Sequence, residues 1–323
     1  MRQKKEKEEK IMKPEILDCT LRDGGLVNRF FFSDELVRDL YQTNLEAGVD
    51  YMEFGYKASE KQFNRKDFGK WKFCREEDIR QVVGDNSSKM KISVMADVGR
   101  TEPSSILARK DSVIDMIRIA TYSSTIPEAL ELLEDCHEKG YETSVNIMAV
   151  SSDTEAVIHE FLGKLCDSPA DVIYLVDSFG AFYPEQIRNL SALYLGYAEK
   201  KGKRLGVHAH NNQQLAFANT IEAIRCGAGF ADATCDGMGR GAGNCSMEML
   251  VGYLKDKQLQ ELPILEFIEK HLIPMKEAGV RWGYELPYLL TGQGRVHPSR
   301  AIQFIQEGCK DIAGMFAQIA AGQ

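Results

Sequence analysis

The sequence lacks the features of membrane, secreted and nucleic-acid-binding proteins. No segment approaches the roughly 20 consecutive apolar residues that a membrane-spanning helix needs, and residues 1–10 lack the apolar middle of a secretion signal. No region is strongly basic, and the net charge over 323 residues is −8, which argues against phosphate backbones as partners. We therefore expect a soluble, cytoplasmic protein with no nucleic-acid or membrane partner.

Closely paired cysteines are also missing. The eight cysteines are scattered along the chain, and none belongs to a Cys-x-x-Cys pair. This spacing argues against a disulfide framework or a zinc knot, so the thiols are expected to be reduced and mostly buried.

What the sequence does contain is an alternation of apolar strand-like runs with helical patterns. Each run is followed by a helical pattern, as in the segment that Ser33 caps and Gly48 ends. The alternation predicts an α/β protein with a parallel sheet, and eight strands favour a (β/α)8 TIM barrel. An open dinucleotide-binding sheet would carry Gly-x-Gly-x-x-Gly after its first strand, where this chain has Arg22-Asp23-Gly24-Gly25. The expected strands are 15–20, 50–55, 90–97, 115–120, 143–149, 171–177, 204–210 and 230–235.

Three parts of the chain differ in character. Residues 1–13 alternate charges with nothing to bury and predict a disordered tail. Residues 14–258 form the expected barrel. Residues 259–323 predict a short helical C-terminal extension that packs on the barrel or at a subunit interface. Its helical patterns lie around 264–278, 284–290 and 298–307.

Two histidines at the end of the seventh strand suggest a metal site. His208 and His210 are two residues apart, so on a strand they point to the same side. In a barrel, the C-terminal strand ends converge on one mouth, and a carboxylate with two imidazoles is a common set of ligands for a divalent metal. We favour Asp23 as the carboxylate, because it lies past the first strand with two glycines behind it, whereas Asp18 lies inside the strand.

Other polar residues at strand ends are candidates for substrate contacts. Arg22 beside a metal implies an anionic substrate or a developing negative charge, and Glu53 is expected to orient it. A purely structural salt bridge from Arg22 to Glu53 or Asp177 is the alternative. A glycine-rich segment, 237–244, follows the last strand, where barrels often bind anions. The expected substrate-binding residues are Asn146, Asp177, Ser178 and Gly241.

Taken together, these motifs resemble the DRE-TIM metallolyases, and most closely the 4-hydroxy-2-oxovalerate aldolase-like proteins. The superfamily also includes hydroxymethylglutaryl-CoA lyase and the isopropylmalate and homocitrate synthases. The resemblance spans about residues 15–256 and rests on four pieces in order, which makes it specific only as a set. They are Leu17-Asp18-Cys19-Thr20-Leu21-Arg22-Asp23-Gly24-Gly25, Glu53, His208-Ala209-His210-Asn211-Asn212 and Gly239-x-Gly241-x-Gly243-Asn244.

The resemblance implies a role for each matching residue. Arg22 would polarise the substrate's keto oxygen and stabilise the enolate, and Glu53 would complete the Asp-Arg-Glu signature. The implied cofactor is a divalent metal, with Mn²⁺ expected first and Mg²⁺, Co²⁺ or Zn²⁺ as alternatives. Its implied ligands are Asp23, His208, His210 and Asn244.

The implied function is that of a metal-dependent lyase that cleaves or forms a carbon–carbon bond next to a 2-oxoacid. The substrates would be a small 2-oxoacid and an aldehyde, and the protein is expected to be a homodimer. No expected strand ends on a lysine, which argues against a Schiff-base aldolase.

The chain departs from the aldolase pattern at one point. Those aldolases carry an acid/base histidine shortly after Arg-Asp-Gly, and residues 25–30 contain none. Tyr288 is our expected catalytic replacement, with Tyr56 or a metal-bound water as alternatives. His297 is expected to be an exposed residue at a helix start. Two other functions stay open: a Claisen-type acyltransferase, and a barrel that has lost the aldol step and serves as a binding partner.

Overall fold

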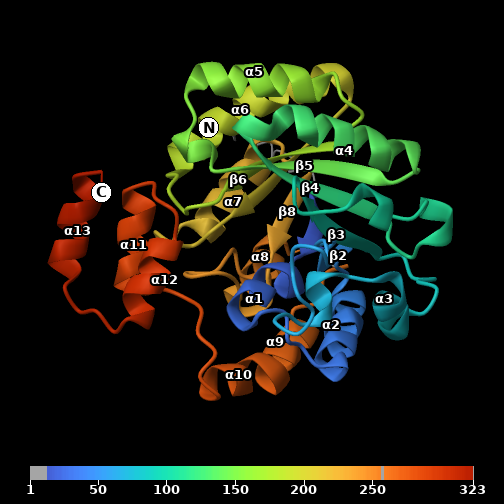
Figure 1. The fold of residues 1–323 in the computed structure, drawn as a ribbon, viewed down its shortest axis with the longest axis horizontal. Coiled ribbons are helices and arrows are strands. Elements are labelled where there is room, and N and C mark those ends of the chain that lie inside the picture. The colour runs from blue at the N-terminus through green and yellow to red at the C-terminus, as the bar shows by residue number, and fades with distance from the viewer. Residues whose placement is uncertain (1–12, 256–257, 323) are drawn as a thin grey trace, which may run out of the picture.

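The computed structural model describes residues 13–255 and 258–322, so all but the last residue of the expected tail lie outside it. Within these residues, eight parallel strands close into a barrel in the order β1 to β8, with helices around it (Figure 1). The expected (β/α)8 barrel is therefore confirmed. The strands are β1 (Glu15–Asp18), β2 (Tyr51–Tyr56), β3 (Lys91–Asp97), β4 (Met116–Tyr122), β5 (Glu142–Met148), β6 (Val172–Asp177), β7 (Arg204–Ala209) and β8 (Phe230–Ala233).

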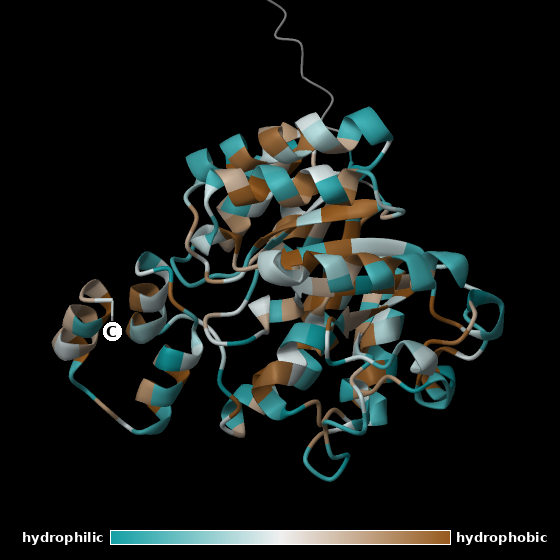
Figure 2. Ribbon diagram, turned by 45° about the horizontal axis from the view of Figure 1, so that its top comes forward, coloured by the Kyte–Doolittle hydropathy of each residue, from teal (hydrophilic) through white to brown (hydrophobic). Residues whose placement is uncertain are grey.

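The strands are buried on both faces, which explains their nearly continuous apolar sequences. All six residues of β2 and of β6 are buried, and the hydropathy colouring shows apolar strands beneath more polar helices (Figure 2). Inside the barrel, the side chains of Leu17, Tyr51, Met116, Val172 and Phe230 belong to one buried apolar cluster. This cluster supports the polar side chains that follow it on the same strands.

The helices of the barrel differ from expectation after one strand. The segment between β3 and β4 is fully described and contains two short 3-10 turns, Pro103–Ser105 and Arg109–Asp111, but no α-helix. The expectation of a helix after every strand was therefore wrong at β3. The barrel helices are α1 (Thr20–Asn28), α2 (Asp34–Ala47), α3 (Glu76–Val83), α4 (Ile126–Glu138), α5 (Glu155–Cys166), α6 (Pro184–Ala198), α7 (Ala216–Cys226) and α8 (Met247–Leu254).

The first strand ends earlier than predicted, at Asp18. The Asp18 carboxylate accepts hydrogen bonds from the backbone N–H and the hydroxyl of Thr20, at 3.0 and 2.5 Å, and from the Asn44 amide at 2.8 Å. This local turn starts α1 at Thr20. Arg22 and Asp23, expected only to follow the first strand, thus lie in the first turn of α1, which fixes their backbone positions.

A glycine in β7 makes room inside the barrel below the histidines. A Cβ at Gly206 would lie 2.6 Å from three ring atoms of Tyr174 on β6, so only glycine admits this buried ring. The Tyr174 ring in turn stacks on the guanidinium of Arg118, 4.5 Å from the ring centroid. Gly206 and His208 are two residues apart on one strand, so both face the same side of the sheet.

The C-terminal part is helical, as expected. A continuous helical stretch passes through α9 (Leu262–Phe267), a π-helical turn (Ile268–Leu272) and α10 (Ile273–Glu277). Three further helices pack together at one side of the barrel (Figure 1). The last of them was not predicted. They are α11 (Leu286–Gln293), α12 (Ser299–Gln306) and α13 (Ile312–Ala320). Among the described helices, none combines the length and the apolar character needed to cross a membrane.

Candidate metal centre

Three side chains meet at the mouth of the barrel as possible metal ligands. Asp23 lies in α1, His208 lies in β7, and His210 is the residue that follows β7. All three are buried. Asp23 Oδ2 lies 3.3 Å from His208 Nε2 and 3.7 Å from His210 Nε2. One ligand atom from each residue falls within 4.8 Å of the others, which is close enough for a single ion to contact all three.

Asn244 lies beside this group. Its backbone forms an isolated bridge with that of His210, and its amide nitrogen donates to the carbonyl of Met238 at 3.2 Å. A Cβ at Gly239 would lie 2.2 Å from this amide nitrogen and 3.4 Å from Asp23 Cγ. The glycine-rich loop therefore lets the Asn244 side chain approach Asp23.

Buried atoms without partners show that this group can accept a cation. Among the described residues, Asp23 Oδ2, His208 Nε2 and Asn244 Oδ1 are buried and have no hydrogen-bond partner. Each such atom costs on the order of 1–3 kcal/mol if it stays unsatisfied. A divalent ion held by oxygen and imidazole ligands would satisfy all three, so the residues fit the cofactor that the sequence predicted.

The protonation states also suit a metal site. Burial disfavours ionisation of Asp23, but the Arg22 guanidinium and the two imidazoles outweigh burial and hold the pKa of Asp23 well below its usual value. Burial lowers the pKa of His210 to about 3. At neutral pH, the aspartate is thus ionised and His210 is neutral, as metal ligation requires. The carboxylates of Asp23 and Asp232 raise the pKa of His208 despite its burial, so a metal would displace a proton from this imidazole.

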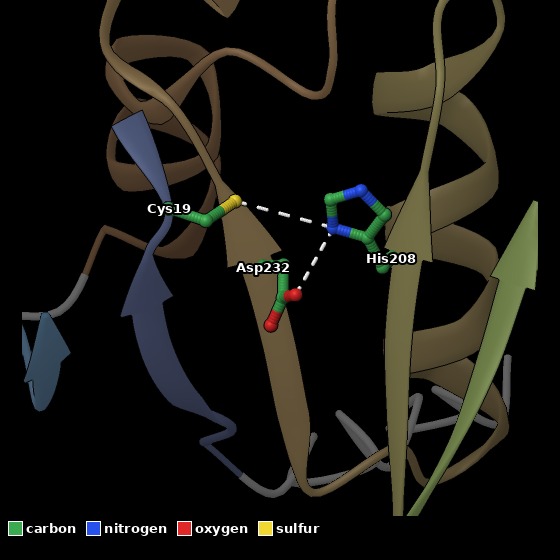
Figure 3. A group of neighbouring side chains, drawn as sticks. All are labelled: Cys19, His208 and Asp232. Atoms are coloured by element: carbon green, nitrogen blue, oxygen red, sulfur yellow. Dashed lines mark hydrogen bonds and ion pairs between the residues drawn. The ribbon is translucent and has the colours of Figure 1, made fainter. Parts of the chain in front are cut away.

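Asp232 on β8 orients His208. Its Oδ2 lies 3.0 Å from His208 Nδ1, and Cys19 Sγ lies 4.0 Å from the same nitrogen (Figure 3). A carboxylate can only accept, so Nδ1 carries the proton and Nε2, on the opposite side of the ring, is left to face Asp23. This is the usual arrangement by which a carboxylate aligns a metal-ligating histidine.

A buried chain of charges connects the two sides of the site. Arg22 Nε donates to Glu53 Oε2 at 2.7 Å, and Arg118 Nη1 donates to the same oxygen at 2.8 Å. The other end of the Arg118 guanidinium, Nη2, donates to Asp232 Oδ2 at 2.6 Å. Arg118 is fully buried, so one guanidinium holds both the partner of Arg22 and the partner of His208.

A small cavity of about 70 Å³ opens onto the candidate ligands. Six of the predicted site residues line it, together with the alternative acid/base residue Tyr56. Asn146 accepts a hydrogen bond from Ser144, and the Ser178 hydroxyl accepts one from the backbone N–H of Ala149. The predicted residues at its wall are Arg22, Asp23, Asn146, Ser178, His208 and His210.

The other predicted residues lie around this cavity but not at its wall. Glu53 sits behind Arg22. The Asp177 carboxylate accepts hydrogen bonds from the backbone N–H groups of Ala181 and Phe182, at 2.8 and 3.2 Å, and burial raises its pKa to about 7. Its contacts stabilise the loop after β6. Gly241 and Tyr288 line a second, neighbouring cavity.

The predicted site set left out Asp232 and Arg118. Both carried a signal: each is a charged residue inside an otherwise apolar run, MIRIA and FADA, where a buried charge needs a partner. The identity of each partner depends on strand register, which is not visible in either run alone.

Comparison with known proteins places this chain in a family. An oxaloacetate decarboxylase from Mycobacterium tuberculosis is 29% identical over 245 residues, which are 75% of this chain and 70% of that protein. A 4-hydroxy-2-oxovalerate aldolase from Geobacillus genomosp. 3 is 31% identical over 245 residues, 74% of this chain and 69% of that protein. The crystal structure of the N-terminal domain of a Bacteroides vulgatus protein, classed provisionally as an aldolase, superposes with a TM-score of 0.78 at 31% identity. It covers 90% of this chain and 96% of that one.

The family model agrees with these relatives and with the resemblance noted from the motifs. The model of the HMGL-like family matches residues 13–269, which include the whole barrel. The expected relation to the DRE-TIM metallolyases is therefore confirmed, and this chain belongs to the HMGL-like family.

Proposed function

We propose that this chain is a divalent-metal-dependent lyase. It would cleave a carbon–carbon bond of a 4-hydroxy-2-oxoacid to give pyruvate and an aldehyde, or form that bond from them. The observation that carries the proposal is that Asp23 Oδ2 and His208 Nε2, both buried and without a hydrogen-bond partner, meet beside the Arg22 guanidinium. The relatives named as aldolases support the same chemistry.

In this proposal, Asp23, His208, His210 and Asn244 hold the metal. When bound, a divalent ion would supply a Lewis acid for the keto and carboxylate oxygens of the 2-oxoacid. Manganese is our expected metal, and the ligand set also suits magnesium, cobalt or zinc. Burial of the four side chains keeps water from competing for their lone pairs.

Arg22 would stabilise the negative charge that develops on the keto oxygen. It lines the cavity, and its Nη1 lies 3.2 Å from Asp23 Oδ2. Glu53 fixes the Nε side of the guanidinium, so the remaining N–H groups have a defined direction before substrate arrives. Preorganised donors of this kind stabilise charge at little reorganisation cost. Asn146 and Ser178, on the opposite wall, would contact the carboxylate of the substrate.

For the acid/base group, the two cavities favour Tyr56 over Tyr288, our expected residue. Tyr56 lines the catalytic cavity, whereas Tyr288 lines the neighbouring one. We therefore propose Tyr56 as the group nearest to the 4-hydroxyl, with Tyr288 as a contact of the departing aldehyde. Burial raises the pKa of Tyr56 despite the nearby Arg22, so Tyr56 acts as a proton donor in the condensation direction.

Decarboxylation of oxaloacetate is a second candidate function. A relative of similar identity carries that name, and residues 25–30 contain no histidine. Loss of the carbon 4 carboxylate of oxaloacetate as carbon dioxide leaves its bonding electrons in the same enolate of pyruvate and needs no base for a 4-hydroxyl. The two candidates share the metal and Arg22 and differ in the bond that breaks.

A single assay tests both proposals. Purified protein with added Mn²⁺ is incubated with a panel of 4-hydroxy-2-oxoacids and, separately, with oxaloacetate, and pyruvate release is followed. We expect release from at least one 4-hydroxy-2-oxoacid and a loss on the order of 10² or more in the Arg22→Met variant. Pyruvate from oxaloacetate alone would favour the second candidate. No turnover of any substrate by protein that has bound metal would contradict both.

A further inference from the structure

We propose that the substrate carries an uncharged alkyl chain on carbon 4, and that this chain binds in a second cavity between the barrel and the C-terminal helices. This inference rests on the proposed function, because it assigns the part of the substrate that becomes the aldehyde. The chain would be longer than the methyl group of a 4-hydroxy-2-oxovalerate.

The volumes of the two cavities support this division of the substrate. The cavity at the candidate ligands measures about 70 Å³, whereas the second measures about 450 Å³. The first has room for a unit of pyruvate size beside Arg22 and the ligands. Any larger substituent on the substrate must extend out of it.

The two cavities share part of their lining. Leu26 and Arg240 line both cavities, and the backbone N–H of Arg240 donates to Asp23 Oδ1 at 3.3 Å. Gly241 follows with φ of +64°, and a Cβ there would lie 3.0 Å from the Tyr288 ring. Residues next to the candidate ligands therefore also line the second cavity.

The walls of the second cavity suit an uncharged chain. Its apolar side chains come from three separate segments: the end of α1, the loop after α10, and α12. Three charged residues also line it: Arg281, which is exposed to solvent, Glu285, and Arg240, whose guanidinium contacts His297 Nε2 at 3.2 Å. The apolar lining residues are Leu26, Val27, Val280, Ile302 and Ile305.

Burial of methylene groups gives a measurable signature. Each buried methylene contributes about 0.8 kcal/mol, or roughly a fourfold gain in affinity. Straight-chain 2-oxoacids share the carbon skeleton of the proposed substrate and need no turnover to bind. From pyruvate to 2-oxooctanoate, which adds five methylenes, we expect the affinity of the Mn²⁺-loaded protein to rise by on the order of 10³ if the whole chain enters the cavity.

The test is a calorimetric titration of the full chain with Mn²⁺ and this series of 2-oxoacids. Ala278→Trp and Gln306→Trp each place a large ring in the cavity from an exposed position, one after α10 and one at the end of α12. In both variants, we expect the ratio of affinities between successive 2-oxoacids of the series to fall from about four to near one. Pyruvate measured in the same variant is the reference. Ala313→Trp, at an exposed position on α13 that does not line the cavity, is the matched control and should keep the full gain.

The outcomes separate this inference from the proposed function. Pyruvate binding with no gain along the series would overturn the second cavity as the chain site but leave the proposed function standing. A gain that survives both tryptophan variants would also overturn it, because the chain would then lie elsewhere. Failure of every 2-oxoacid to bind would contradict the proposed function together with the inference.

Discussion

At the mouth of the barrel, His208 and Arg22 each use one nitrogen to donate to a buried carboxylate, and their remaining nitrogens face the candidate site. His208 donates through Nδ1 to Asp232 and keeps Nε2 open towards Asp23. Arg22 donates through Nε to Glu53 and keeps its other nitrogens near the cavity. In each case, a buried carboxylate sets the direction, so the two functional groups depend on residues that do not line the cavity.

Removing either histidine should remove the metal. His208→Ala and His210→Ala each delete one imidazole from a three-residue group, so we expect the affinity for Mn²⁺ to fall by on the order of 10² or more. Metal content after gel filtration measures the loss, and circular dichroism checks that the barrel stays folded. His159→Ala, on the outer helix α5, is the matched control and should bind metal normally. Stoichiometric metal in both mutants would show that the ligand set is wrong.

Arg22→Lys should separate metal binding from turnover. A lysine keeps the positive charge beside Asp23, so metal should remain bound. It cannot donate to Glu53 and to the substrate in the fixed geometry of a guanidinium, and we expect turnover to fall by on the order of 10² or more. Steady-state pyruvate release and metal analysis on the same sample measure the two effects. Near-normal rates would leave Arg22 with only the structural salt bridge to Glu53.

At the scale of elements, the barrel strands are coupled through charges as well as through their ladders. Glu53 lies on β2, Arg118 on β4 and Asp232 on β8, and their side chains meet inside the barrel. β7 contributes His208 to the same network. Strands that are not neighbours in the sheet are thereby held at fixed distances below the site.

Arg118→Met should weaken both the fold and the site. It leaves Glu53 and Asp232 buried without their shared cation, so we expect the free energy of unfolding to fall by about 3–5 kcal/mol. Because Asp232 then loses the partner that holds it against His208, affinity for Mn²⁺ should also fall by roughly 10–100-fold. Urea denaturation and metal titration measure the two changes.

Arg188→Met supplies the control for this prediction. Arg188 is more than half exposed and pairs with Glu222 on the outside of the barrel, where an ion pair contributes about 0–1 kcal/mol. The control should keep its metal affinity. Equal effects of the two substitutions would show that the buried network has no special role.

At the scale of the whole molecule, the candidate metal ligands come from parts of the chain that are far apart in sequence. The candidate ligands come from α1, β7 and the loop after β8, at the two ends of the barrel sequence where β1 pairs with β8. An ion held there would link the start and the close of the barrel. The oligomeric state stays a prediction, with a homodimer expected.

Metal should therefore raise the thermal stability of the protein. At a free Mn²⁺ concentration of 100 times Kd, binding stabilises the native state by about 2.7 kcal/mol, which corresponds to a rise in Tm of several degrees for a chain of this size. Calorimetry with Mn²⁺ and with a chelator measures the shift. The Asp23→Ala variant should show none. An unchanged Tm in wild-type protein at saturating metal would contradict a site that links these segments.

The barrel and the approximate position of the site follow from the sequence by itself. Alternating strand and helix patterns are local, and they specify a parallel barrel because each strand needs two buried faces. His208 and His210 share a face because strand side chains alternate, and Arg22 and Asp23 follow the first strand. The C-terminal ends of barrel strands meet at one mouth, so these residues could be placed together without coordinates.

Only the tertiary structure decided which side chains hold the candidate site residues in place. The register between strands places Asp232 against His208 and Arg118 between Glu53 and Asp232, and no single strand records the residue that will lie opposite. The packing of α11 and α12 against the loop after β8 likewise put Tyr288 and Gly241 in the second cavity and left Tyr56 at the first. Contacts of this kind depend on how distant segments pack, because the partner of a buried charge or ring comes from another segment that tertiary folding places next to it.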